Sequence, residues 1–146
     1  MALLNYTTKI DADKTAGEIA KMLSMAGAKA VLTEYDQQDA SVKSISFQMK
    51  LGDHDVGFRL PCDWNPVQQV LEEQKRKNSR IDTSREQAVR VAWRIVKDWI
   101  EAQLAIIETK MVKTEQVFLP YALTKDGTTL YEKVITDGGF LLGPGK

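Results

Sequence analysis

The sequence predicts an α+β domain, in which a largely antiparallel sheet of about four strands packs against one long central helix. Residues 83–111 contain no Gly or Pro, and their apolar positions recur with the helical period. Residues 44–51, within a predicted strand at 42–51, alternate strictly between polar and apolar side chains, as strands with one solvated face do. The order of such segments along the chain is β-α-β-β-β-α-α, which favours a sheet of neighbouring antiparallel strands.

The first half of the chain accounts for all four predicted strands and one helix. Residues 4–10 alternate with a period of two and contain strand-forming types, so they predict the first strand. Asp11 is placed to cap a following helix, and Gly27 is placed to end it. The remaining strands are expected where alternation resumes between turn residues. These segments are 29–35, 42–51 and 56–60, with turns at 36–39 and 52–55.

The second half is predicted to be mainly helical. Asn65-Pro66 is a typical helix start, and this second helix gives way to a polar stretch at 75–80. Thr83 and Glu86 have the spacing of a capping box, which should begin the long helix. Beyond it we expect a short helical segment that is capped by Thr114 and bent or ended by Pro120. Residues 128–135 fit either a strand or a short helix, and a loose glycine-rich tail follows from about residue 137. Residues 1–146 should form one domain.

The long helix has more apolar surface than one sheet can cover. Its apolar arc spans about 200°, whereas one sheet face requires roughly 100°. Either the C-terminal segments or another copy of the chain should cover the rest, so we expect a homo-oligomer. Arg85 and Gln103 interrupt this arc. A buried guanidinium or amide needs polar partners, so these side chains either bond buried backbone or an acidic side chain, or line a polar pocket between helix and sheet. For Arg85 the further alternative is exposure at the end of the helix.

Composition limits the classes of function. The 20 basic residues balance the 20 acidic ones, so no overall charge would hold the chain on nucleic acid or an anionic membrane. Any such binding requires a local patch. Cys62 is the only cysteine, which excludes an internal disulfide and a multi-cysteine metal site. The chain lacks a signal-peptide pattern and a membrane-spanning segment, so we expect a cytoplasmic protein.

One region of the chain is strongly basic. Phosphate binds well to paired guanidinium donors and to a helix start, so a phosphate near Arg80, Arg85 and the Thr83-Ser84 cap is one interpretation. The alternative is a solvated face, because Glu86 with Arg90 and Arg94 with Asp98 have the spacing of helical ion pairs. The region runs from 75 to 97 and contains Lys75, Arg76, Lys77, Arg80, Arg85, Arg90, Arg94 and Lys97.

Aromatic residues extend this hypothesis. Trp93 and Trp99 flank the apolar arc near Arg94, where they either stack a nucleic-acid base or belong to the core. The candidate ligand-binding residues are therefore Arg59, Arg80, Arg85, Arg90, Trp93, Arg94, Lys97, Trp99 and Gln103.

Catalytic chemistry has little support in the sequence. Asp53-His54-Asp55 contains acid, base and metal-ligand types, but these residues are consecutive in a predicted turn and point in different directions. Cys62 has no neighbouring base that would activate it. No phosphate-binding glycine loop, nucleophile elbow or zinc motif is present. We predict no catalytic residue, no metal and no cofactor.

Several strings resemble a family of small uncharacterised proteins encoded by bacteriophages and prophages. They are Asn5-Tyr6-Thr7-Thr8-Lys9-Ile10, Ser44-Ile45-Ser46-Phe47, Phe58-Arg59-Leu60-Pro61, Arg90-Val91-Ala92-Trp93-Arg94, Lys97-Asp98-Trp99 and Ala102-Gln103-Leu104. The resemblance implies a bacterial cytoplasm as the setting and assigns no chemistry.

For function we expect a small non-catalytic binding protein, an inhibitor or sequestering factor that acts on a host or defence component. Its ligand would be a phosphate-bearing molecule, a nucleic acid or an acidic protein. The residues expected to bind it are Arg59, Arg80, Arg85 and Arg94. We expect no binding to a membrane. The two alternatives are a nucleic-acid-binding accessory protein and a nucleotide- or nucleic-acid-processing enzyme. A steep loss of affinity with salt would favour nucleic acid over a nucleotide pocket.

Overall fold

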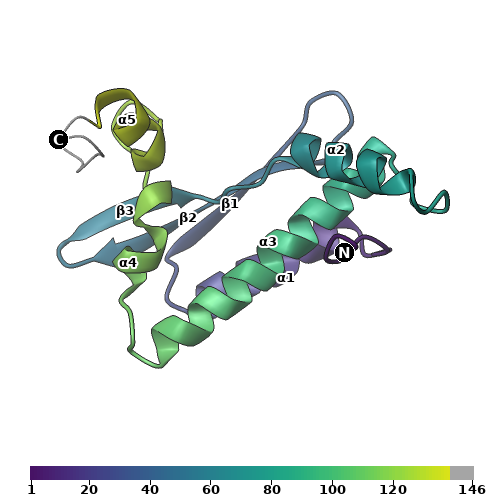
Figure 1. Cartoon of the computed structure of the whole chain (residues 1–146). Helices are drawn as coiled ribbons and strands as arrows, with labels where there is room; N and C mark the ends of the chain where they lie inside the picture. The colour runs from purple at the N-terminus through teal and green to yellow at the C-terminus, as the bar shows by residue number, and fades with distance from the viewer. Residues whose placement is uncertain (139–146) are drawn as a thin grey trace, which may run out of the picture.

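The computed structural model describes residues 1–138 and has an α+β fold (Figure 1). A three-stranded antiparallel sheet has the order β1-β2-β3. Helices precede and follow it along the chain. The elements are α1 (Ala12–Met25), β1 (Ala30–Tyr35), β2 (Val42–Leu51), β3 (His54–Arg59), α2 (Trp64–Lys75), α3 (Arg85–Glu108), α4 (Thr114–Phe118), the 3-10 helix η1 (Leu119–Tyr121) and α5 (Leu130–Asp137).

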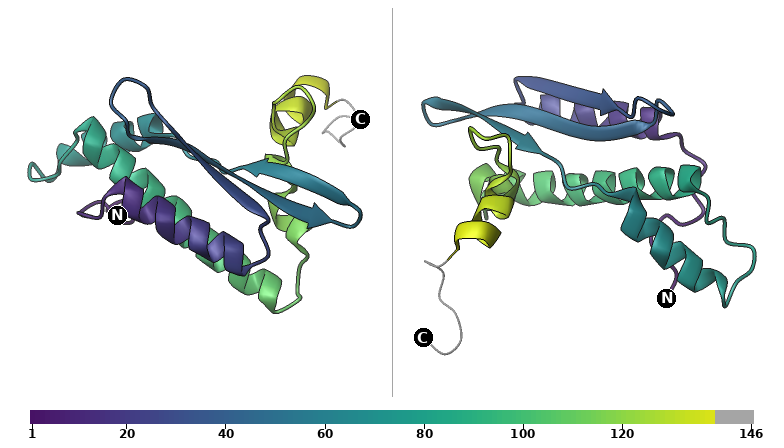
Figure 2. Two further views of the ribbon diagram at one scale, coloured as in Figure 1. Left: turned by 180° about the vertical axis from the view of Figure 1, so that it is seen from behind. Right: turned by 90° about the horizontal axis from the view of Figure 1, so that it is seen from above.

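Most of the core lies between the sheet and the two helices α1 and α3, which run side by side (Figures 1 and 2). Alternation in β2 places Ile45, Phe47 and Met49 in this core, and Val42 also lies in it, beyond a register shift in the pairing with β1. A smaller core holds α2 against the first half of α3 and contains Leu71, Ile81, Ala88 and Val91. The long helix therefore shares its layer with α1 and also carries α2.

The first predicted strand is wrong. Residues 4–7 form turns, with hydrogen bonds from the Tyr6 nitrogen to the Leu3 oxygen and from the Thr8 nitrogen to the Asn5 oxygen. The side chain of Gln87 in α3 donates to the backbone oxygens of Tyr6 and Thr8, at 2.9 and 3.0 Å. The backbone oxygens of Tyr6 and Thr8 therefore accept hydrogen bonds from a helix. They do not need a neighbouring strand as their donor. The sheet has three strands instead of about four, and the element order changes accordingly.

Several helix starts differ from the predicted ones by one or two residues. α3 begins after Ser84, whose side chain accepts a hydrogen bond from the Gln87 nitrogen, so Thr83 is not the cap. α2 begins after Asp63, which accepts from the Asn65 nitrogen. Asp11 does precede α1, but its side chain makes no capping bond. Several polar residues stand near each start, and which one caps depends on packing that the sequence does not display.

The C-terminal elements also depart from the expected pattern. Lys113, not Thr114, occupies the N-cap position of α4, where its backbone nitrogen donates to the Gln116 side-chain oxygen at 2.7 Å, and Pro120 lies inside η1. The ambiguity at 128–135 resolves as helix α5, which a capping box between Thr129 and Glu132 begins. The turn at 52–55 is shorter than predicted, because His54 already belongs to β3. The predicted loose tail falls almost entirely on residues 139–146, which lie outside the described part of the chain.

Candidate functional site

Arg85, a central residue of the predicted phosphate site, is balanced by acidic neighbours. One terminal nitrogen lies 3.4 Å from a carboxylate oxygen of Asp36 and 3.2 Å from one of Asp39. The guanidinium also sits over the ring of Trp64, 4.7 Å from its centroid. Its buried Nε atom has no hydrogen-bond partner among the described residues. Arg85 thus fastens the loop between β1 and β2 to the helices.

The hollow beside Arg85 is more acidic than basic. Its volume is about 270 Å³, and Arg85 and Arg90 are the two cations at its border. The four carboxylates at the same border are Asp11, Asp13, Asp39 and Glu86. Hydrogen bonds from Ser41 lower the pKa of the Asp39 carboxyl, which favours its charged form. A phosphate would meet more like charge than opposite charge here, so this hollow is a poor phosphate site.

Arg94 and Lys97 of α3 each form an ion pair with a carboxylate. Arg94 approaches Glu18 of α1 at 2.6 Å and also donates to the Thr15 hydroxyl at 3.3 Å. Only 13% of its side chain is exposed. Lys97 lies 3.5 Å from Glu101 in the next helical turn. Arg94 therefore links two helices, and it does not form the predicted pair with Asp98.

Arg90 is oriented by a buried neighbour. Its Nε atom donates to the side-chain oxygen of Gln87 at 2.9 Å, and the expected pair with Glu86 does not form. Asp98, the predicted partner of Arg94, accepts instead from the amide of Asn5 at 2.8 Å. Neither predicted ion pair forms: Arg90 is bonded within α3, whereas Arg94 and Asp98 contact α1 and the N-terminal segment.

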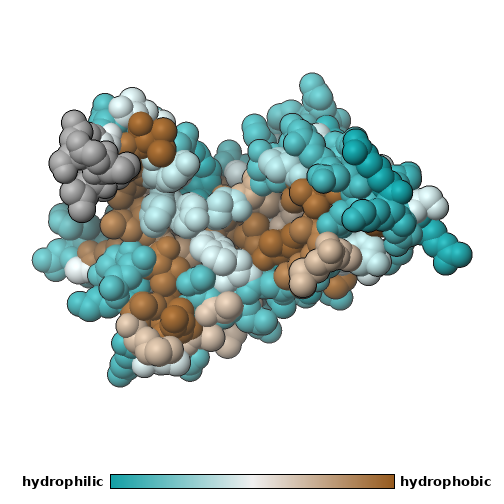
Figure 3. Space-filling view, viewed as in Figure 1, coloured by the Kyte–Doolittle hydropathy of each residue, from teal (hydrophilic) through white to brown (hydrophobic). Residues whose placement is uncertain are grey.

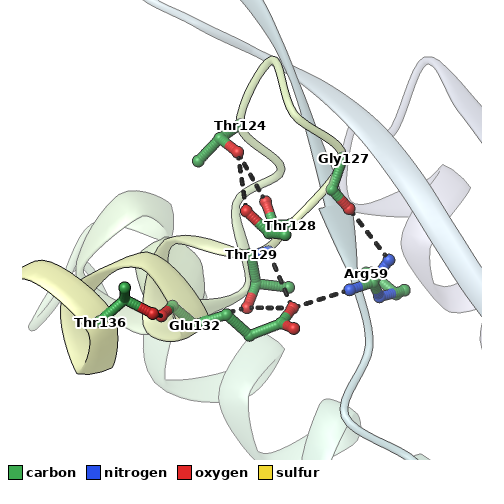
Figure 4. Close-up of polar contacts among 7 residues, drawn as sticks. All are labelled: Arg59, Thr124, Gly127, Thr128, Thr129, Glu132 and Thr136. Atoms are coloured by element: carbon green, nitrogen blue, oxygen red, sulfur yellow. Dashed lines mark hydrogen bonds and ion pairs between the residues drawn. The ribbon is translucent and has the colours of Figure 1, made fainter.

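Arg59 lies in a different environment from the arginines of α3 (Figure 4). It extends from the end of β3 toward α5, where it donates to Glu132 at 2.9 Å and to the Gly127 oxygen at 3.4 Å. The same carboxylate accepts from the backbone and hydroxyl of Thr129, both at 3.0 Å. Arg59 thus links the end of β3 to α5 and to the turn at Gly127, and Glu132 balances its charge.

Both tryptophans of the candidate site pack in the core. Trp93 is 2% exposed, and its indole nitrogen donates to the Val42 oxygen. Trp99 is partly buried and meets Phe118 and Tyr121 edge-on, with ring centroids 5.9 and 5.5 Å away. The core alternative is confirmed for Trp93, which has no ring face free for a base.

The polar residue that the helix buries is Gln87 rather than Gln103. Gln87 is 2% exposed, and its side chain bonds Tyr6, Thr8 and Arg90. Gln103 is partly exposed, with no side-chain hydrogen bond to the described residues. The sequence analysis missed Gln87. One signal for Gln87 was its spacing, because it lies four residues before the apolar Val91 and so shares a helix face with it. In the structure this face meets α2 and the N-terminal segment.

Arg80 belongs to an exposed basic turn that joins α2 to α3. We define the basic turn as Lys75, Arg76, Lys77 and Arg80, all of which are exposed. None of the four forms an ion pair with a residue in 1–138. The backbone beneath them is fixed, since Asn78 accepts from the Arg80 nitrogen at 3.2 Å and Ile81 is buried in the smaller core. Glu72 and Glu73 border a shallow hollow with Arg76.

The residues with catalytic potential do not assemble into a centre. Asp53, His54 and Asp55 are all exposed, and Asp55 pairs with Lys29 at 2.8 Å, a contact that lowers the pKa of its carboxyl. Burial, together with the nearby Asp63 charge, raises the pKa of Cys62 to about 12, so its thiol stays protonated. Among residues 1–138, no group of three or more potential metal ligands is found.

Comparisons with protein-family models, with curated proteins and with solved structures found no match for this chain. In the part of the chain that the structure describes, no helix has both the length and the apolar character that a membrane crossing needs. Function is therefore inferred from the geometry of the chain itself. Of the nine predicted site residues, Arg80 alone belongs to the basic turn.

Proposed function

We propose that this protein is a non-catalytic binding protein that meets an anionic macromolecule through the basic turn. In the phage setting implied by the sequence resemblance, it would inhibit or sequester a host or defence component with an acidic or phosphate-bearing surface. The observation that carries the proposal is the gathering of four exposed cations within six residues, none in an ion pair with residues 1–138. By contrast, ion pairs with carboxylates are formed by Arg59, Arg85 and Arg94.

The form of the turn favours a large partner over a small one. Small-molecule sites are usually concave and bury most of their ligand. The basic turn is exposed along its length, whereas the hollow next to Arg85 is lined by an excess of carboxylates. The basic turn is anchored by Ile81 and Asn78, and this reduces the backbone entropy lost on binding. An extended anionic surface can contact these exposed cations without the concave site that a small ligand needs.

A nucleic acid is the second candidate partner, because the same cations suit backbone phosphates. Lys and Arg contacts to phosphates give binding that is insensitive to sequence and steeply dependent on salt. Trp93 is buried, so no stacking by this residue would add base recognition. The enzyme alternative has no comparable observation in its favour among residues 1–138.

The test measures binding to labelled polyanions by fluorescence anisotropy. The probes are duplex DNA, single-stranded DNA, RNA and a polyglutamate peptide, each titrated from about 50 mM salt upward. One variant replaces the basic turn by alanine (Lys75→Ala, Arg76→Ala, Lys77→Ala, Arg80→Ala). The matched control removes the same charge from four scattered exposed lysines (Lys14→Ala, Lys21→Ala, Lys43→Ala, Lys125→Ala). Circular dichroism confirms that both variants remain folded.

We expect the turn variant to bind at least about tenfold more weakly than wild type, and the control to stay within about twofold. A preference for polyglutamate identifies an acidic protein surface as the partner class, and a preference for DNA or RNA identifies nucleic acid. The proposal fails if wild type binds none of the four probes. It also fails if the control loses as much affinity as the turn variant, because overall charge would then explain the binding.

A further inference from the structure

The last turns of α3 carry apolar surface that the described chain does not cover. The fully buried side chains of α3 end at Ile100, and Leu104 and Ile107 beyond it are only partly buried. They border a groove of about 640 Å³ between the ends of α1 and α3 and the sheet. Three methionines line the same groove, namely Met22, Met25 and Met49. Unbranched, polarisable methionine side chains adapt readily to a partner's shape.

A protruding apolar side chain lies beside this groove. Met111 follows α3 directly and is 70% exposed, and Met25 on the groove wall is 79% exposed. Glu108 and Thr114, which flank Met111 in the sequence, both border the groove. Figure 3 shows apolar residues gathered where α3 ends and the chain turns toward α4. The groove and the protruding methionine therefore belong to one end of the molecule.

The charges around these two features are complementary. Two glutamates stand at the border of the groove, and of these Glu101 already pairs with Lys97, whereas Glu108 forms no ion pair with the described residues. Lys110 and Lys113 flank Met111 and are exposed, and neither forms an ion pair with the described residues. Lys110 adopts a left-handed φ of 68° just beyond the end of α3, as residues that follow a helix often do. Met111 with its two lysines thus has the shape and charge that the groove of another copy would accept.

We propose that the groove is occupied by a second copy of this chain, in a two-fold dimer where Met111 of each copy enters the groove of the other. A two-fold contact requires one surface that carries both a projection and its complement, and the end of α3 meets this requirement. The lysines beside each Met111 then approach the glutamates that border the opposite groove. The contact also covers the part of the long apolar arc that the described chain leaves half-buried.

The test is the mass of the protein by sedimentation equilibrium over a wide range of concentrations. Wild type should sediment as a dimer at high concentration, and Met111→Asp should raise the dimer dissociation constant at least about tenfold. Ile135→Asp is the matched control, since Ile135 is 68% exposed on α5, away from the groove. This control should dimerise like wild type. The alanine variant of the basic turn, which lies before the other end of α3, should do so too.

Charge reversal tests the orientation of the two copies. Glu108→Lys and Lys113→Glu should each weaken the dimer, and the double variant should regain most of the loss. The proposal is overturned if wild type remains a monomer at the highest attainable concentration, in which case the groove awaits a different partner. It is equally overturned if Met111→Asp dimerises as wild type does. Failure of the double variant to recover contradicts the lysine-to-glutamate pairing.

Discussion

The indole nitrogen of Trp93 donates a hydrogen bond to the backbone oxygen of Val42, with 3.2 Å between the two atoms. This bond ties the middle of α3 to the first residue of β2. Both residues are buried, at 2% and 3% exposure, so the contact belongs to the main core. Trp93 is therefore a structural residue, and its removal should affect stability before it affects any binding.

Replacing Trp93 by Phe should lower the free energy of unfolding by about 1–3 kcal/mol, because the Val42 oxygen loses a buried donor, with a further loss from the smaller ring. Urea unfolding followed by circular dichroism measures this. Trp99→Phe is the comparison, since Trp99 is only partly buried and makes no side-chain hydrogen bond to the described residues. An equal loss in the two variants would show that the Trp93 bond contributes nothing specific.

Gln87 should contribute more to stability than Gln103, although both interrupt the apolar pattern of α3. Gln87→Ala leaves the oxygens of Tyr6 and Thr8 without their donor, so we expect a loss of about 1–3 kcal/mol and faster hydrogen exchange in residues 3–10. Gln103→Ala should change stability by less than about 0.5 kcal/mol. Comparable effects of the two substitutions would contradict this account of the N-terminal segment.

Arg94 and Arg80 should behave in opposite ways. Arg94→Ala removes the partner of Glu18 and of the buried Thr15 hydroxyl, and it should destabilise the fold by about 1–3 kcal/mol. Arg80→Ala should leave the free energy of unfolding within about 0.5 kcal/mol of wild type, because Arg80 is exposed and forms no ion pair within residues 1–138. Thermal unfolding of the two variants side by side would decide whether Arg94 is structural.

Glu132 should make the attachment of α5 depend on pH (Figure 4). Hydrogen bonds from Thr129 lower the pKa of its carboxyl below the ordinary 4.5, with a smaller contribution from Arg59. A lowered pKa means that the folded state favours the carboxylate, so this stabilisation is present above pH 4.5 and is lost as the pH falls through the lowered pKa.

Accordingly, Glu132→Gln should speed hydrogen exchange in α5 at neutral pH, and the difference from wild type should shrink as the pH falls below 4.5. The exposed Glu72 provides the control, since Glu72→Gln should leave exchange in α5 unchanged at every pH. A gap between Glu132→Gln and wild type that stays constant across this range would show that the carboxylate charge is not the cause.

Local patterns predicted those parts of the fold that depend on neighbouring residues. The strand predicted at 42–51 matches β2 to the residue, and the unbroken helical period matches α3 apart from its two ends. The first predicted strand failed because the same alternation also fits a segment whose backbone oxygens are satisfied by Gln87. That contact joins residues about 80 positions apart, and no local pattern records it.

The sequence displays the composition of the basic region but not the arrangement of its charges. The run of basic residues from 75 onward is visible in the sequence, and so is the positive charge of the α3 arginines. Which of those charges remain available depends on the carboxylates of other elements, such as Glu18 beside Arg94 and Asp36 beside Arg85. The distinction between occupied and available cations therefore emerges only from the folded chain.

The salt dependence of polyanion binding tests the central claim most directly. If the basic turn is the contact surface, the plot of log affinity against log salt for the preferred polyanion should be steep for wild type. The slope should fall by about one for each turn residue that contacts the partner and is replaced by alanine. Identical slopes for wild type and the four-residue variant would contradict the claim that this turn binds the partner.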